Sequence, residues 1–292
     1  MKKMQKILSL ALVLLMAASL AACGNSKSNA DNPYNLVTPG KLTVAISPDF
    51  SPMEFVDTSK SGQEQYVGFD PTMARYIAEQ MGLELEIKPM SFDACQAAVQ
   101  TGNVDMSISG FSWTEEREAN YNLSDIYIAG ENETEQAIIT LKENEGAWTQ
   151  ASDFSGKKVG AQIASLQMNL CNDQLPEDAE IVTFTDIGTA VEALRTGNID
   201  ALAVAKGNGD AIIANNDAIA FTGFLFEVDE KAENNLILLK KGADDLTAKV
   251  NEILAKLHAE GLNFQWYAEA EELAGISTAA EVSYDAEGNV EE

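Results

Sequence analysis

The sequence predicts an α/β protein made of two lobes that share one plan. Residues 101–105 (TGNVD) and 196–200 (TGNID) each close a helical stretch and lead into an apolar strand. A Gly-Lys pair opens an earlier strand in each half, at Gly40 and at Gly156. The matches are short and their spacing varies, so they indicate repeated architecture and not a duplicated sequence. A chain of 292 residues is long enough for two such lobes.

Strands and helices are expected to alternate along the first half of the chain. The short apolar run before Ser109 favours a buried strand, and Gly82 is placed to end a helix at its C-cap. A turn-rich loop over residues 48–52 follows the first strand, where α/β folds place ligands. Strands are expected over residues 40–47, 83–88 and 104–108, and helices over 69–81 and 91–100.

The second half repeats this alternation and ends in helices. Apolar side chains at positions 246, 250, 253, 254 and 257 form the stripe of an amphipathic helix that stops before Gly261. Strands are expected over residues 136–141, 156–159, 218–221 and 236–240, and helices over 206–215, 244–258 and 263–271.

The first residues have the features of an export signal. A lysine-rich start precedes an apolar run from Ile7 to Ala22, which is too short and too rich in alanine for a membrane span. The ending Leu20–Cys23 resembles the lipobox of bacterial lipoproteins, in which the cysteine is lipidated. We therefore expect a lipoprotein signal peptide over residues 1–22 and lipidation at Cys23. An ordinary cleaved signal is the alternative.

Polar segments flank the predicted globular body. Residues 23–35 are rich in Asn, Ser, Lys and Asp and are expected to form a flexible tether. Residues 277–292 are expected to form a loose acidic tail. A tether of this kind suits a body that acyl chains hold at a membrane.

Charge and cysteine content exclude some classes of protein. The net charge is −27, and removal of the lysines at positions 2, 3 and 6 with the signal takes it to −30, which argues against nucleic acid as a partner. One histidine and no Cys/His cluster argue against a transition-metal site. Cys95 and Cys171 fall in different predicted lobes, so we expect two separate buried side chains and no disulfide.

The stretch from Ser109 to Arg117 has the features of an anion site. It follows a predicted strand, and Ser112 with Glu115 forms a capping-box pattern that starts a helix near Trp113. A cation in the first turn of a helix opposes the helix dipole, so Arg117 is expected to hold an anion. Serine hydroxyls, strand-end amides and one arginine together suit a carboxylate or a phosphate.

Two of these side chains also have simpler explanations. Arg117 has acidic neighbours at positions 115, 118 and 125, with which it would form a surface ion pair. Phe50 lies in the loop after the first strand, where it is suited either to stack on a ligand or to fill the core.

The motifs, in this order behind the export signal, resemble the extracellular solute-binding proteins of family 3, the polar amino-acid receptors of ABC importers. The resemblance covers about residues 38–270. Its motifs are Gly40–Val44, Ser47–Phe55, Gly68–Asp70, Ser91–Ala94, Thr101–Asp105, Ser109–Arg117, Leu123–Asp125, Gly156–Gln162, Ser165–Gln167, Thr196–Asp200 and Leu238–Gly242.

The resemblance implies a two-lobed, type II periplasmic-binding-protein-like fold with two hinge crossings and a ligand cleft between the lobes. Lobe 1 would comprise residues 36–129 and 235–276, and lobe 2 residues 130–234. Gly130, near the first crossing, is a candidate hinge residue. The chain is expected to be a monomer without a cofactor.

The resemblance also implies roles for individual residues. Arg117 would bind the ligand α-carboxylate as a bidentate fork. Ser109, Gly110, Phe111 and Ser112 would add hydroxyl and amide contacts. From other segments, the implied ligand-binding residues are Phe50 and Phe92, on either side of the ligand, and Ser165, Leu166 and Gln167 at a helix N-terminus of lobe 2. Ser165 as a plain N-cap and Phe92 as a core aromatic are the alternatives.

The sequence departs from the family pattern where the ligand ammonium group is bound. The acid that family members commonly place after the second-lobe strand is replaced by Ala205, followed by Lys206, and Ser47 replaces an acid found in the first loop of some members. Candidate replacements are Asp49, Glu54, Asp93 and Glu227. The other possibility is that the ligand is a carboxylate without an ordinary ammonium group.

The implied function is that of a lipid-anchored receptor outside the cytoplasm. It would capture an amino acid or a similar small carboxylate and present it to a membrane permease and its ATPase. One alternative is an enzyme similar to cyclohexadienyl dehydratases, for which the sequence offers no nucleophile–base pair. Another alternative is a sensory or adhesive lipoprotein.

Overall fold

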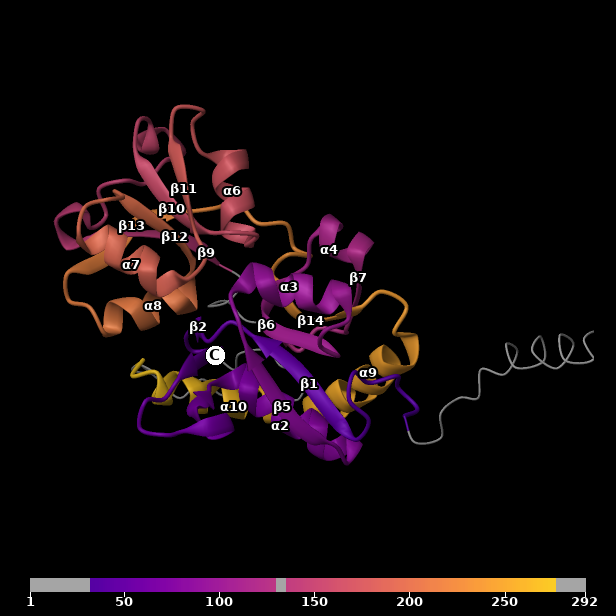
Figure 1. Cartoon of the computed structure of the whole chain (residues 1–292). Helices are drawn as coiled ribbons and strands as arrows, with labels where there is room; N and C mark the ends of the chain where they lie inside the picture. Colours follow the sequence, from indigo (N-terminus) through magenta and orange to yellow (C-terminus); the bar gives the residue numbers. More distant parts are fainter. Residues whose placement is uncertain (1–31, 130–134, 277–292) are drawn as a thin grey trace, which may run out of the picture.

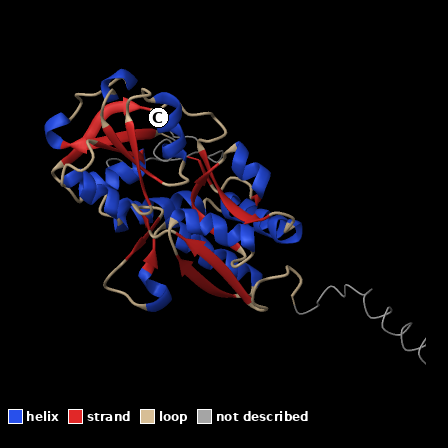
Figure 2. Cartoon of the chain, turned by 45° about the horizontal axis from the view of Figure 1, so that its top comes forward, coloured by secondary structure: helices blue, strands red, loops and turns tan. Residues whose placement is uncertain are grey.

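The computed structural model describes residues 32–129 and 135–276. These residues form two α/β lobes, and lobe 1 is built from both ends of the described chain (Figure 1). Figure 2 shows the strands in separate groups with helices around them. The predicted signal peptide, Cys23, Gly130, the tail over 277–292 and all of the tether before residue 32 lie outside the described residues.

The sheet of lobe 1 has the order β5-β1-β6-β14-β7, and β8 also pairs with β14. β1 is parallel to β5 and β6, whereas β14 is antiparallel to β6 because it returns from the other lobe. The strands are β1 (Lys41–Ile46), β5 (Glu84–Pro89), β6 (Met106–Ser112), β7 (Tyr121–Leu123), β8 (Ile128–Ala129) and β14 (Asn234–Lys240).

Helices and a small second sheet complete lobe 1. The small sheet, in the order β2-β3-β4, carries the loop that follows β1. Its strands are β2 (Asp49–Phe50), β3 (Glu54–Val56) and β4 (Tyr66–Val67), with the 3₁₀ helix η1 (Gly62–Gln65) between β3 and β4. The helices are α2 (Phe69–Met81), α3 (Phe92–Thr101), α4 (Glu115–Asn120), α9 (Asp244–Ala259) and α10 (Leu262–Leu273).

Lobe 2 has one sheet with the order β11-β10-β12-β9-β13. Its strands are β9 (Gln136–Leu141), β10 (Lys158–Gln162), β11 (Glu180–Phe184), β12 (Ala201–Ala205) and β13 (Ile219–Leu225). Its helices are α6 (Leu166–Gln174), α7 (Ile187–Arg195) and α8 (Lys206–Ala214), with 3₁₀ turns η2 (Lys142–Asn144) and η3 (Ala151–Phe154). The chain enters this lobe between β8 and β9 and leaves it between β13 and β14.

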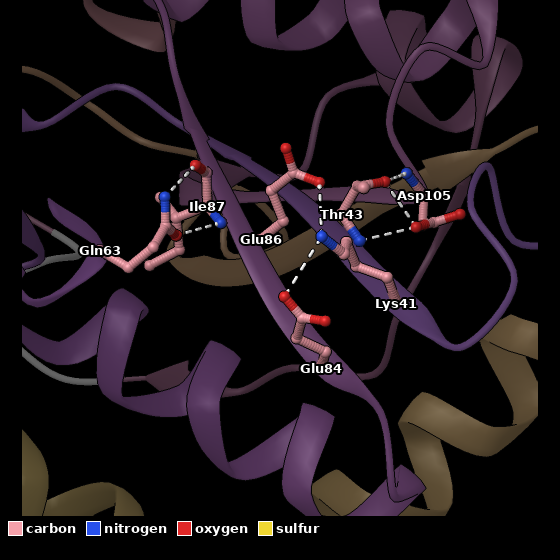
Figure 3. Close-up of polar contacts among 7 residues, drawn as sticks. All are labelled: Lys41, Thr43, Gln63, Glu84, Glu86, Ile87 and Asp105. Atoms are coloured by element: carbon pink, nitrogen blue, oxygen red, sulfur yellow. Dashed lines mark hydrogen bonds and ion pairs between the residues drawn. The ribbon is translucent and has the colours of Figure 1, made fainter.

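The two lobes repeat one arrangement of strands. The order β5-β1-β6-β14 in lobe 1 corresponds to β11-β10-β12-β9 in lobe 2. Each TGN turn places an aspartate against the neighbouring strand: Asp105 accepts from the amide of Thr43 at 2.7 Å, and Asp200 accepts from the amide of Lys158 at 2.8 Å. Figure 3 shows the first of these contacts. The predicted repetition of architecture is confirmed.

Polar contacts fix the outer strand β5 of lobe 1 (Figure 3). The ammonium group of Lys41 lies 3.2 Å from a carboxylate oxygen of Glu84 and 3.7 Å from one of Glu86. The side-chain oxygen of Gln63 accepts from the amide of Ile87 at 2.7 Å, and its NH₂ donates back to the Ile87 carbonyl at 3.2 Å. Gln63 thus satisfies backbone groups of an outer strand that would otherwise be open to another chain.

The cysteines behave as predicted. Cys95 packs in the core of lobe 1 and Cys171 in that of lobe 2, and both are free. Burial raises the pKa of each thiol to about 12, so both are inert at neutral pH.

Two local predictions were wrong around the expected anion site. β6 does not end before Ser109 but continues to Ser112, because β14 pairs with it as far as the contact between Asn235 and Ser112. The N-cap of the next helix is Thr114 and not Ser112: the Thr114 hydroxyl accepts from the amide of Arg117 at 3.1 Å. Within the ranges that the structure describes, no helix has the length and apolar character needed to span a membrane.

Candidate ligand-binding site

A pocket lies between the two lobes, at the carboxyl ends of β6 and β12. Its cavity volume is about 30 Å³, so a ligand of amino-acid size can enter only when the lobes move apart. The residues that line it are Phe50, Phe92, Ser109, Gly110, Ser112 and Arg117 of lobe 1, and Gln162, Ser165, Leu166, Gln167, Ile187, Ala190, Leu202, Ala203, Val204, Ala205 and Asn208 of lobe 2.

Arg117 is the central polar group of this pocket. Its side chain is buried, with 4 % of its surface exposed. Its Nη1 donates to the carbonyl of Ser112 at 2.7 Å and its Nη2 to the carbonyl of Ala164, in lobe 2, at 3.0 Å. Its Nε lies 3.4 Å from the side-chain oxygen of Gln96. These neutral partners take only part of the donor set of a guanidinium fork, so Arg117 can also bind an anion.

The surface ion pair considered for Arg117 is absent. No carboxylate among the described residues forms a salt bridge with it, and its position in the cleft keeps it away from the solvated surface. Burial lowers its pKa to about 10, which still leaves the guanidinium charged at neutral pH. A buried cation that no described carboxylate contacts directly is a strong reason to expect an anionic ligand.

Two aromatic rings pack against the guanidinium group of Arg117. Its central carbon lies 5.6 Å from the ring centre of Phe92 and 5.2 Å from that of Phe111. The two rings stack with centres 4.8 Å apart. Phe111 is fully buried and does not line the pocket, so its side chain positions Arg117 and is not placed to touch a ligand. Phe92 packs in the core and also lines the pocket. The core role considered for it is therefore compatible with a place beside a ligand.

Phe50 reaches the pocket because Gly110 leaves room for it. A Cβ atom at position 110 would lie 2.6 Å from Cε1 of Phe50. Gly110 also has a φ of 53°, in the left-handed region that favours glycine. The amide of Gly110 donates to a carboxylate oxygen of the buried Asp70 at 2.9 Å, so this amide is not available to a ligand in the way that the resemblance implies.

Lobe 2 presents the start of α6 to the pocket. Ser165 is the N-cap of this helix, since its hydroxyl accepts from the amide of Met168 at 3.1 Å, and it also lines the pocket. Leu166 and Gln167 form the first helical turn, whose free amides and positive dipole end favour an anion. The side chain of Gln167 is held by the oxygen of Gln136 at 2.6 Å.

Hydrogen bonds join the lobes on both sides of the pocket. Asp49 accepts from the amide of Ile187 at 2.7 Å and from the side chain of Gln162 at 3.3 Å. The Asn208 side chain donates to the carbonyl of Ser51 at 2.9 Å. With the contact of Arg117 to Ala164, these bonds hold the lobes together.

None of the acids considered as an ammonium partner lines the pocket. The carboxylate of Asp49 already accepts a hydrogen bond from lobe 2, through the amide of Ile187. Asp93 accepts from the Ser91 hydroxyl at 2.6 Å, and Glu227 is exposed. Glu54 is buried beside Asp70 and accepts a hydrogen bond from the hydroxyl of Ser109. The ammonium anchor expected from the resemblance is therefore not an acid among these four in the described structure.

The Glu54–Asp70 pair instead supports the strand that carries Ser109 and Gly110. Burial, and next the charge of Asp70, raise the pKa of Glu54 well above its usual value. Burial also raises the pKa of Asp70 to about 7. The pair therefore carries a proton in weakly acidic solution, because two adjacent buried carboxyl groups cannot both ionise easily.

Sequence reasoning missed most of the lobe 2 wall. Val204 and Ala205 occupy in β12 the places that Ser109 and Gly110 occupy in β6, so the internal repeat carried a signal for Val204, and Ala205 was named from the sequence. Ile187, Ala190 and Asn208 carried none, and Gln162 was noted only as the end of the motif Gly156–Gln162. No cluster of three His, Cys, Asp or Glu side chains arranged to hold a metal ion occurs among residues 32–129 and 135–276.

Comparisons with solved structures reveal close likeness in fold. The amino acid ABC transporter substrate-binding protein AbpA from Streptococcus pneumoniae, bound to L-arginine, superposes with a TM-score of 0.74 at 32 % identity, over 82 % of this chain and 97 % of that one. An ancestral arginine-binding protein bound to glutamine superposes with a TM-score of 0.70 at 28 % identity, over 80 % and 98 %. The predicted two-lobed, type II periplasmic-binding-protein-like fold is confirmed.

Sequence comparisons agree with the structural ones. A probable histidine-binding protein from Campylobacter jejuni is 30 % identical over 253 residues, which cover 83 % of this chain and 93 % of the relative. The L-cystine-binding protein TcyJ of Escherichia coli is 29 % identical over 265 residues, covering 88 % and 94 %. The family profile of the bacterial extracellular solute-binding proteins, family 3, matches residues 42–269. The chain belongs to this family of extracellular solute-binding proteins.

Proposed function

We propose that this protein captures an amino acid or a similar small carboxylate between its lobes and delivers it to an ABC importer. The observation that carries this proposal is Arg117, a buried cation that lines the pocket and forms no salt bridge with a carboxylate among the described residues. A carboxylate would bind its free N–H groups and neutralise its charge.

The relatives support the class of ligand without naming it. Their names give histidine, cystine and arginine, and a related ancestral protein is bound to glutamine. These ligands differ in side chain but share an α-carboxylate and an α-amino group. A site centred on one arginine suits the part that they share.

The lobes are suited to close on the ligand. Arg117 contacts a carbonyl of lobe 2, and Asp49 binds lobe 2 through the amide of Ile187. A ligand that touches both sides favours the closed form, since only that form offers contacts from both lobes. In our proposal a permease and its ATPase respond to the closed shape, and lipidated Cys23 holds the protein at the outer side of the membrane as a monomer.

The proposed role is binding and not catalysis. In the described structure Arg117 is the one charged side chain that lines the pocket, so no acid–base pair faces a ligand there. The relatives named above are binding proteins as well. Conversion of prephenate or arogenate to an aromatic product would instead support the dehydratase alternative.

A thermal-shift screen tests the proposal. Residues 24–292 are unfolded, freed of carried-over ligand and refolded, then heated with each standard amino acid, cystine, ornithine, small dicarboxylates and amines. A ligand at about a thousand times its Kd stabilises the folded state by about 4 kcal/mol. We expect a shift with at least one carboxylate, its loss in Arg117→Met, and its retention in Arg195→Met, whose arginine forms a surface ion pair with Glu192. A shift that survives in Arg117→Met, or no shift with any carboxylate, contradicts the proposal.

A further inference from the structure

Asn208 lies in the pocket with an unused hydrogen-bond acceptor. It is in the first turn of α8, lines the pocket and is 1 % exposed. Its Nδ2 donates to the carbonyl of Ser51 at 2.9 Å, which fixes the orientation of the amide. Its Oδ1 is buried and has no donor among the described residues. A buried oxygen without a donor is uncommon and indicates a partner that the chain does not supply.

Asn208 stands close in sequence to the position where an acid is missing. Ala205, at the end of β12, lines the pocket with an apolar side chain. Lys206 pairs with Asp210 at 2.8 Å, and neither of them lines the pocket. The Oδ1 atom of Asn208 is thus a neutral acceptor presented by the same strand–helix junction.

Among the residues that the structure describes, no charged side chain other than Arg117 lines the pocket around Asn208. Ile187, Ala190, Leu202 and Val204 line this side of the pocket, and Phe50 faces it from lobe 1. A cationic side chain would be buried here without a counter-charge, and an acidic one would need a second cation besides Arg117. The wall therefore favours an uncharged ligand body.

Asp49, which bonds to two residues that line the pocket, does not change this conclusion. The carboxylate of Asp49 accepts hydrogen bonds from the Ser47 hydroxyl at 2.8 Å, from the Ile187 amide at 2.7 Å and from the Gln162 side chain at 3.3 Å. These bonds use its oxygens for lobe closure, and it does not line the pocket.

We propose that Asn208 is a ligand-binding residue whose Oδ1 accepts a hydrogen bond from an N–H or O–H group on the carbon next to the ligand carboxylate. The ligand class is then a 2-amino or 2-hydroxy acid with an uncharged side chain. This inference rests on the proposed function, because it takes the carboxylate to be bound by Arg117. An amide oxygen accepts from an ammonium or a hydroxyl group, whereas a carboxylate at the same place would strongly prefer the ammonium group.

Matched probes separate these cases by isothermal titration. The nine probes are three sets, each of a 2-amino acid, its 2-hydroxy analogue and the unsubstituted acid: L-alanine, L-lactate and propionate; L-leucine, L-2-hydroxy-4-methylpentanoate and 4-methylpentanoate; L-phenylalanine, L-3-phenyllactate and 3-phenylpropionate. L-Arginine is the charged comparison. In the set that binds best, we expect the amino and hydroxy acids to agree within about tenfold in Kd and each to bind at least about tenfold more tightly than the unsubstituted acid, as one hydrogen bond to a buried acceptor allows.

Two variants at position 208 test the residue itself. Asn208→Asp keeps the shape of the side chain and adds a negative charge. It should therefore favour the 2-amino acid over its 2-hydroxy analogue by at least about tenfold more than the unaltered protein does. Asn208→Leu should remove the advantage of both substituted acids over the unsubstituted one. The control is Asn216→Asp, two residues after the end of the same helix and outside the pocket lining, which should leave all ratios unchanged. The Asn216 side chain donates to the Ile212 carbonyl at 2.8 Å. Thermal melts confirm that each variant folds.

Each outcome decides the inference separately from the proposed function. Unchanged ratios in both Asn208 variants, with binding lost in Arg117→Met, overturn the role of Asn208 and leave the proposed function standing. Tighter binding of L-arginine than of any uncharged probe, or binding by none of the nine while another carboxylate binds, overturns the ligand class. Binding that survives in Arg117→Met overturns the proposed function as well.

Discussion

The Nη2 atom of Arg117 lies 3.0 Å from the carbonyl oxygen of Ala164, and this hydrogen bond joins lobe 1 to lobe 2. The side-chain NH₂ of Gln96 donates to the same oxygen at 3.3 Å. The cation proposed to bind the ligand carboxylate therefore also contacts the opposite lobe. In the proposed function, this one side chain would couple ligand binding to lobe closure.

Ala164 adopts a backbone conformation that suits glycine. Its φ is 61°, in the left-handed region, which costs a residue with a Cβ about 1–2 kcal/mol. Glycine would relieve this strain, but it also gives the unfolded chain more conformational freedom, which favours unfolding by about 0.4–1 kcal/mol. We expect Ala164→Gly to raise the free energy of unfolding by about 0.5–1 kcal/mol, as measured by urea denaturation. Ala97→Gly, in the exposed part of α3, should lower it, and equal effects of the two changes would contradict this account.

Gly110 is expected to control the position of Phe50. Gly110→Ala would bring a Cβ to 2.6 Å from the Phe50 ring and so displace a ring that lines the pocket. Gly40 also has a positive φ, of 82°, but no atom lies within 4 Å of its would-be Cβ. Both alanine variants should lose about 1–2 kcal/mol of stability from backbone strain. Only Gly110→Ala should weaken ligand binding, by about tenfold or more in calorimetric titration; equal affinity of the two variants would argue against the role of Phe50.

Asp49 is expected to favour the closed arrangement of the lobes. Asp49→Ala removes the bonds to the Ile187 amide and the Gln162 side chain. A smaller closed population lowers the apparent affinity in proportion, so we expect Kd to rise about tenfold. We also expect a larger radius of gyration in X-ray scattering. The control is Asp93→Ala, whose carboxylate binds Ser91 within lobe 1. If both variants scatter like the unaltered protein, Asp49 does not hold the lobes together.

The Glu54–Asp70 pair predicts a pH dependence of stability. The folded-state pKa of Asp70 is about 7, against an ordinary 3.8, and that of Glu54 is raised as well, so the folded state binds more protons than the unfolded state over this range. Stability should therefore fall as pH rises from about 4 toward 7, with a slope of up to about 1.4 kcal/mol per pH unit for each group. Urea unfolding at pH 5, 6, 7 and 8 measures it. The neutral double variant Glu54→Gln, Asp70→Asn should lack this slope, and parallel curves for both proteins would refute the prediction.

The sequence predicted what depends on local pattern. The two TGN turns predicted matching sheets, and the order of strands around β1 and β10 agrees. Arg117 was predicted to hold an anion because a cation opposes the dipole at a helix start, and the structure places it in the pocket. The end of β6 was placed wrongly because its pairing with β14 is fixed by residues more than a hundred positions away.

The remaining parts of the site depend on packing between distant segments. Phe111 sits beneath Arg117 because it stacks on Phe92 from α3. Asn208 reaches the pocket only because the lobes meet at Ser51. Neither contact has a signature in the sequence around it, since both arise from how the lobes fold and close.

The most direct test of the central claim asks whether Arg117 recognises a carboxylate. The tightest-binding acid from the screen and its primary amide are titrated calorimetrically into the unaltered protein and into Arg117→Met. The unaltered protein should prefer the acid by about a hundredfold or more, which corresponds to about 2.7 kcal/mol, and Arg117→Met should bind both alike. The same preference for the acid in both proteins would contradict the assignment of Arg117 as the carboxylate-binding residue.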